Sequence, residues 1–144
     1  MIQRIQSIFL FLASVSFWGL FGLPFAKSEA VMPGIFADQL YNVFDNPLLI
    51  TLTVIGGIIA LLAIFLFNNR SMQKKLNYGI ITISILLLGV AALLVFQDEH
   101  TESVASISEG FGLGLPVFAI IFSILANRYI GKDDKLVKSM DRLR

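Results

Sequence analysis

The sequence predicts an all-α integral membrane protein, a four-helix bundle with both termini in the cytoplasm. Three observations predict it: an apolar composition, four long windows without ionisable residues, and basic residues that cluster on one side of those windows. Of the 144 residues, 56% are hydrophobic and 15% are charged, whereas a soluble domain has about 45–50% apolar and about 25% charged residues. A chain of this length fits one domain, so residues 1–144 are expected to form a single membrane unit.

Four apolar windows are long enough to cross a bilayer, for which a helix needs about 20 mostly apolar residues. Each should be helical, because backbone N–H and C=O groups in lipid can pair only within the segment. The first window could alternatively be a secretory signal peptide, but its apolar run exceeds the roughly 7–15 residues of such segments. The windows are Ile5–Ala26, Pro47–Phe67, Leu76–Phe96 and Phe111–Asn127.

The basic residues give the bundle its expected orientation. Lys27 alone lies on the side opposite the termini, and the other Lys and Arg residues lie on the side of the termini. Because basic residues near span ends are retained in the cytoplasm, we expect the loop 68–75 and the tail 128–144 inside and the loops 27–46 and 97–110 outside. The residues on the inner side are Arg4, Arg70, Lys74, Lys75, Arg128, Lys132, Lys135, Lys138, Arg142 and Arg144.

The tail carries the candidate interaction residues. Gly131 is expected to break the fourth helix, and Asp133 or Asp134 could cap a new, short amphipathic helix. Such a helix could lie on anionic lipid, dock a protein partner, or only anchor the topology. Its candidate residues are Arg128, Lys132, Lys135, Leu136, Val137, Lys138, Asp141, Arg142, Leu143 and Arg144.

The outer loops are harder to interpret. In the first, aromatic and aliphatic residues follow a turn signal at Pro33 and Gly34, which favours a short interfacial helix over an extended strand across the bundle mouth. In the second, three carboxylates and His100 within 97–102 could bind a divalent cation, although a solvated acidic loop is the favoured interpretation. The glycines at 110, 112 and 114 are typical of a flexible helix start rather than a nucleotide site, which needs a cytoplasmic face.

Residues for catalysis, metal binding or cofactor binding are not evident. The sequence has no cysteine and one histidine, and the four windows contain no Asp, Glu, Lys, Arg or His, which argues against proton relays and intramembrane catalysis. The near-neutral net charge of +1 gives no reason to expect a nucleic-acid partner. Gly56 and Ala60 form a small-xxx-small pattern that predicts close helix packing, within the chain or in a homo-oligomer.

Both ends of the chain resemble a known family. The N-terminus reads Met-Ile-Gln-Arg-Ile-Gln over residues 1–6, and the C-terminus ends in Asp-Arg-Leu-Arg over residues 141–144. The stretch 132–139 and the Gly-Leu-Gly-Leu-Pro run at 112–116 fit the same pattern. The chain therefore resembles a family of small four-span inner-membrane proteins of unknown function from the Bacteroidetes. The resemblance implies the fold and the membrane, but no catalytic residue.

The expected function follows from these absences and from the tail. We expect a non-enzymatic inner-membrane protein that acts as an accessory or interaction component through its basic cytoplasmic tail. The alternative is a small oligomeric transporter or channel-like protein, which the lack of charge within the spans makes less favoured.

Overall fold

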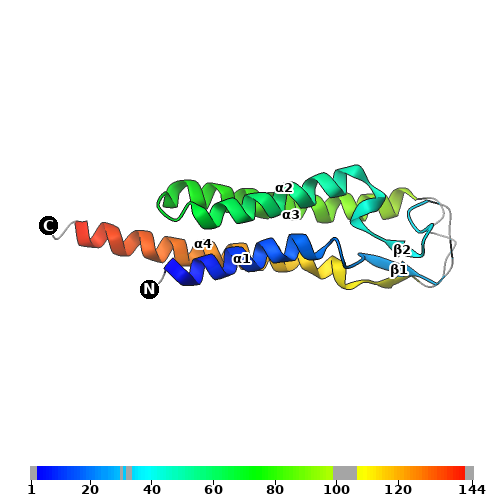
Figure 1. The fold of residues 1–144 in the computed structure, drawn as a ribbon, viewed down its shortest axis with the longest axis horizontal. Helices are drawn as coiled ribbons and strands as arrows, with labels where there is room; N and C mark the ends of the chain where they lie inside the picture. The colour runs from blue at the N-terminus through cyan, green and yellow to red at the C-terminus, as the bar shows by residue number, and fades with distance from the viewer. Residues whose placement is uncertain (1–2, 30, 32–33, 99–106, 142–144) are drawn as a thin grey trace.

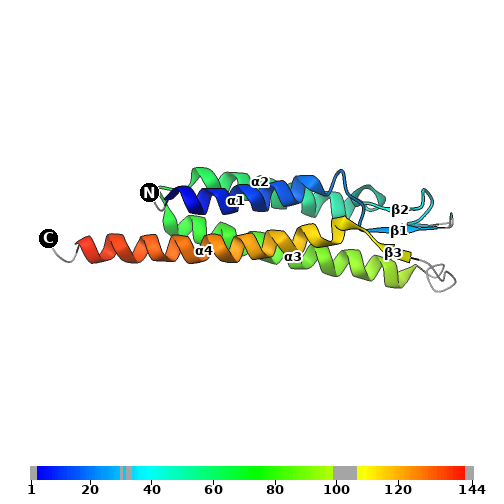
Figure 2. The same ribbon diagram turned by 90° about the horizontal axis from the view of Figure 1, so that it is seen from below.

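Four helices form an elongated bundle in this computed structural model, which describes residues 3–29, 31, 34–98 and 107–141. Helix α1 packs against α2 and α4, and α3 packs against the same two helices, so α1 lies diagonally across the bundle from α3. Figures 1 and 2 show both termini at one end and the short strands at the other. The helices are α1 (Gln3–Gly19), α2 (Pro47–Phe65), α3 (Arg70–Gln97) and α4 (Gly114–Asp141).

Three of the four predicted spans are helices long and apolar enough to cross a membrane. They lie within Pro47–Phe65, Arg70–Gln97 and Phe111–Val137. The first helix has 17 residues and ends at Gly19, so it is about 25 Å long, short of the roughly 30 Å of a hydrocarbon core. Its outward face is nevertheless apolar, since Phe11 is 54% and Val15 47% exposed, as on the other three helices. The structure therefore supports a membrane protein.

The first outer loop contains short strands and a 3-10 helix, η1 (Val43–Asp45), in place of the favoured interfacial helix. The alternative, an extended strand across the bundle mouth, describes it better. Strand β1 (Ala26–Ser28) pairs with β2 (Leu40–Tyr41) and with β3 (Ile107–Glu109), both antiparallel. The sheet order β2-β1-β3 ties the two outer loops together. Burial explains the outcome, because Phe36 and Tyr41 are each only 1% exposed and pack into the bundle mouth. An interfacial helix would have left these rings at headgroup depth.

The glycines before α4 have a structural requirement at this end. The Gly110 N–H donates to the Phe25 carbonyl and the Gly112 N–H to the Pro24 carbonyl, both at 2.9 Å. A Cβ atom on Gly112 would lie 2.5 Å from the Leu23 carbonyl oxygen. This turn of chain, which includes the 3-10 helix η3 (Phe111–Leu113), therefore fits only without side chains at these two positions.

Helix boundaries differ from expectation on the side of the termini. Asn69 caps α3 by accepting from the Met72 N–H at 3.1 Å, so most of the loop expected at 68–75 is helix. Helix α4 continues through Gly131 to Asp141, and the expected break at this glycine is wrong. Glycine within a helix costs only about 1 kcal/mol, and contacts with α3 described below hold the following turns. The candidate tail residues up to Asp141 are thus the last turns of the fourth helix.

Candidate functional site: the basic end of the bundle

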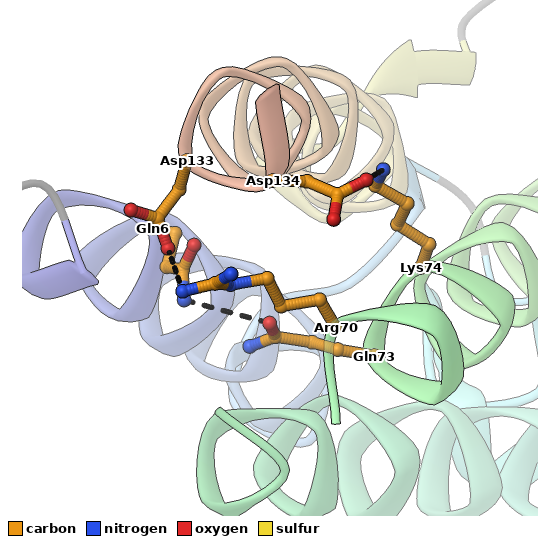
Figure 3. A network of polar contacts seen from close by, with 6 residues as sticks. All are labelled: Gln6, Arg70, Gln73, Lys74, Asp133 and Asp134. Atoms are coloured by element: carbon orange, nitrogen blue, oxygen red, sulfur yellow. Dashed lines mark hydrogen bonds and ion pairs between the residues drawn. The ribbon is translucent and has the colours of Figure 1, made fainter. Parts of the chain in front are cut away.

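The basic residues of two helices meet at one end of the molecule. We call this the basic end: the start of α1, the α2–α3 connection, the first two turns of α3 and the last turns of α4. Arg70 and Lys74 on α3 face Asp133 and Asp134 on α4 (Figure 3). The structure therefore brings the predicted cytoplasmic loop and the predicted tail together, although some 60 residues separate them in sequence.

Two ion pairs join α3 to α4. Arg70 Nη2 lies 2.9 Å from Asp133 Oδ2, and Lys74 Nζ lies 3.3 Å from Asp134 Oδ2 (Figure 3). The first pair is the more buried, with side chains 21% and 13% exposed against 32% and 28% for the second. Asp133 and Asp134 are thereby engaged by α3, and the exposed charged side chains described beside them on α4, Lys132 and Lys135, are basic.

A layer of buried amides lies next to the ion pairs and connects all four helices. Gln6 Nε2 on α1 is 3.4 Å from Gln73 Oε1 on α3, across the bundle diagonal (Figure 3). Gln73 Nε2 donates to the Ala63 carbonyl on α2 at 2.9 Å. Asn77 Nδ2 donates to the Ser123 carbonyl on α4 at 2.7 Å. Buried polar groups are costly unless paired, so this layer fixes how the four helices meet.

The sequence prediction did not include these amides, because only ionisable residues within spans indicate a functional site by themselves. Gln6 and Asn77 lie inside the first and third windows, and all three amide side chains are fully buried. Gln73 and Asn77 are four residues apart, which places them on one face of a helix. This spacing of two amides beside a cluster of basic residues is the feature of the sequence that indicates a polar layer. It does not indicate that Gln73 pairs with Gln6, 67 residues away.

The predicted tail residues fall into a described and an undescribed group. Leu136 is 48% and Val137 37% exposed, and Lys132 and Lys135 are exposed beside them. Lys132 Nζ also lies 5.4 Å from the centre of the Tyr129 ring. Arg128 is exposed one turn earlier. The side chains of Lys138 and Asp141, and all of Arg142, Leu143 and Arg144, lie outside the described residues.

The small residues of α2 pack inside the chain. A Cβ atom on Gly56 would overlap the ring of Phe17 on α1, and one on Gly57 would lie 3.1 Å from the Trp18 indole. Ala60 is fully buried. Gly56 and Ala60 therefore lie within the bundle, on the face of α2 that packs against other helices of the same chain.

In the acidic stretch 97–102, the structure describes Gln97 and Asp98. Asp98 Oδ2 accepts from the Ile35 N–H at 3.2 Å, so this carboxylate binds the first outer loop. Glu99, His100 and Glu102, which the cation hypothesis needs, lie outside the described residues. Within the described part of the chain, His, Cys, Asp and Glu form no group of three that could hold a metal ion.

An apolar cavity of about 250 Å³ lies at the sheet end. It lies between α3 and the strands, and Phe25, Tyr41 and Ala91 line it together with Glu109. The Tyr41 hydroxyl donates to the Ala91 carbonyl at 3.0 Å. Burial, and to a smaller extent the nearby charge of Asp45, raises the pKa of the Tyr41 hydroxyl, so this tyrosine is a structural donor.

Comparison with known proteins identifies the family but no activity. The model of a domain of unknown function, DUF4293, matches residues 2–143. The chain belongs to this family. No curated protein and no solved structure matches it. Family membership agrees with the expectation of an uncharacterised family, and it assigns no role to the residues of the basic end.

Proposed function

We propose that the protein is a non-enzymatic inner-membrane protein that acts as an accessory or interaction component, with both termini in the cytoplasm. The last turns of α4 would bind a protein partner. One observation carries this proposal: α4 extends beyond the α2–α3 connection and beyond the start of α1 (Figures 1 and 2). Its projecting part presents exposed Leu136 and Val137 next to Lys132 and Lys135.

The direction of α4 favours a protein partner over a lipid surface for these turns. An amphipathic helix that binds lipid lies in the plane of the interface, whereas a helix continuous with a span leaves the bilayer along the bundle axis. From Lys132 to Asp141 such a helix extends about 15 Å, and a headgroup layer is roughly 5–8 Å thick on each side. The ion pairs at Asp133 and Asp134 hold this projection in place.

A pull-down with the intact chain and point variants tests the proposal. The variant Leu136→Ser with Val137→Ser removes the exposed apolar pair without touching the core. Met72→Ser is a matched control, because Met72 is 46% exposed on α3 at the same end. We expect a partner that is captured by the wild type and by the control and lost with the double variant. The same proteins captured by all three would refute a role for α4.

The transporter or channel alternative draws on the buried polar layer. Side-chain oxygens of Gln6, Asn77 and Ser123 are buried without a hydrogen-bond partner among the described atoms, and they could bind water or a cation along a path. The amide nitrogens of the same layer, however, are bonded to carbonyls of neighbouring helices, which favours a packed bundle. Ion flux in vesicles that is abolished by Asn77→Leu would support the alternative.

A further inference from the structure

A polar hollow lies between α3 and α4 at the basic end, apart from the projecting turns of α4. Its volume is about 510 Å³, and it is lined by Ser71, Lys74, Lys75, Tyr78 and Asp134. Four of these residues come from the first three turns of α3, and Ser71 lies in the first turn, where the helix dipole adds partial positive charge. A hollow with two ammonium groups and two hydroxyls offers several hydrogen-bond donors to one anion.

The charges of the hollow are only partly balanced. Lys74 is paired with Asp134 at 3.3 Å. Lys75 is exposed, and within the part of the chain that the structure describes it has no carboxylate within ion-pair distance. The lining therefore has a net charge of about +1, which matches a phosphodiester with a single negative charge.

The position of the hollow indicates where that phosphodiester comes from. Tyr78, which is 62% exposed, sits where the apolar surface of α3 gives way to Lys74 and Lys75, and tyrosine is enriched at the membrane interface. The hollow thus opens at headgroup depth, on the side where basic residues gather. Basic pockets between spans on the cytoplasmic side bind anionic headgroups.

We propose that this hollow binds the headgroup of an anionic phospholipid. The Lys75 ammonium contacts the phosphate, and the hydroxyls of Ser71 and Tyr78 donate to its oxygens. The bound lipid headgroup lies where α3 and α4 are in contact, beside the Lys74–Asp134 ion pair. This site is separate from the proposed partner surface on Leu136 and Val137, so either proposal can fail without the other.

Lipid titration of the full chain in detergent, followed by native mass spectrometry and thermal unfolding, tests the site. The probes are phosphatidylglycerol, phosphatidylcholine and, as a soluble source of phosphate, glycerol phosphate. We expect phosphatidylglycerol to bind and to raise the unfolding temperature, and the other two to do neither. Equal binding of both phospholipids would overturn the proposal, and so would equal binding of glycerol phosphate.

Matched charge variants locate the site. Lys75→Ala should weaken phosphatidylglycerol binding roughly fivefold, the effect of one basic residue near an anionic surface. Lys135→Ala removes the same charge from the projecting part of α4 and should leave the affinity unchanged. Unfolding temperatures without lipid check that both variants fold, and Ser71→Ala provides a second variant with no change of charge. Loss with Lys135→Ala but not with Lys75→Ala, or no loss with either lysine variant, would contradict the assignment.

Discussion

The two ends of the bundle are held together by different kinds of interaction. At the basic end, long side chains reach across between helices: Gln6 to Gln73, and Arg70 to Asp133. At the sheet end, backbone pairs with backbone in three short strands, and glycines let the chain before α4 approach the segment after α1. The first kind of contact fixes the helices through their side chains, while the second fixes the backbone itself.

The contrast is between backbone hydrogen bonds at the sheet end and side-chain contacts, some of them partly exposed, at the basic end. The partly exposed ion pairs at the basic end can be broken or exchanged for a ligand while the buried amides beside them keep the helices in place, which suits a surface that binds a partner or a lipid. The sheet end closes the bundle mouth over Tyr41 and Phe36, both nearly inaccessible. We therefore expect substitutions at the sheet end to affect stability most, and those at the basic end to affect local order and binding.

The largest effect is expected for Gly112→Ala. The added Cβ would meet backbone atoms of Leu23 and Pro24, which cannot rotate away as a side chain can, so we expect a loss of about 3 kcal/mol in the free energy of unfolding. Gly89→Ala is the control, since a Cβ there meets nothing within 4 Å. Thermal unfolding in detergent should show a lower midpoint for the first variant only. Equal midpoints would mean that the close approach does not matter.

A smaller effect is expected for Gln73→Leu. The substitution leaves the Gln6 amide without its partner across the bundle and the Ala63 carbonyl without its donor, at a cost of about 1–2 kcal/mol. Adding Gln6→Leu to this variant removes the amide that Gln73→Leu left without a hydrogen-bond partner. The double variant should therefore lose less stability than the sum of the two single variants. Strictly additive losses in the same unfolding assay would show that the two amides do not interact.

The ion pairs should matter locally and unequally. Asp133→Asn breaks the more buried pair and should destabilise the last turns of α4 by about 1 kcal/mol, whereas Asp134→Asn breaks a more exposed pair and should cost about half as much. Hydrogen exchange of the backbone amides of 130–141 measures both. Faster exchange with the second variant than with the first would reverse our ranking of the pairs.

The smallest effect is a pH dependence at the sheet end. Burial raises the pKa of the Asp45 carboxyl, the Asp38 charge raises it further, and the hydrogen bond from the Asn42 N–H opposes both. The folded state thus holds this proton more tightly than the unfolded chain, whose Asp pKa is about 3.9. The contribution of Asp45 is present below that pH and is lost as the pH rises through the higher folded pKa.

Asp45→Asn isolates this contribution, because the amide oxygen can still accept from the Asn42 N–H. The unfolding midpoint of the wild type should fall relative to the variant as the pH rises above about 4. The difference between the two proteins removes the effect of other carboxyls that titrate in the same range. A constant difference between the two midpoints from pH 4 to pH 6 would exclude Asp45 as its source.

The sequence predicted the parts of the fold that local patterns determine. Apolar windows located α2, α3 and α4, and Asn46 with Pro47 marks the start of α2, where Asn46 Oδ1 accepts from the Leu48 N–H at 2.9 Å. The sheet could not be predicted, because its strands have two or three residues and β1 pairs with a strand some 80 residues away. The course of α4 past Gly131 depends on ion pairs with α3, and no local propensity contains that information.

The sequence predicted which basic residues belong to the candidate site, but not which side chains they contact. The basic residues of 70–75 and those of the described part of the tail lie at one end of the bundle, as predicted, and Arg70 and Lys74 meet α4 there. The sequence predicts a helix cap at Asp133 or Asp134, whereas both carboxylates form ion pairs with α3. The buried amides depend on which helices lie diagonally in the bundle, and that follows from tertiary packing alone.

The central claim is that the bundle crosses the bilayer with its basic end in the cytoplasm. The chain has no cysteine, so a single introduced thiol reports its own position. Ser139→Cys marks the basic end and Ser108→Cys, on β3, marks the sheet end; both positions are exposed. The reagent is a membrane-impermeant maleimide, applied to cells whose outer membrane has been made permeable and whose inner membrane is still sealed. We expect Ser108→Cys to be labelled at once and Ser139→Cys only after the inner membrane is permeabilised. Labelling of Ser139→Cys while the inner membrane is sealed would contradict the account.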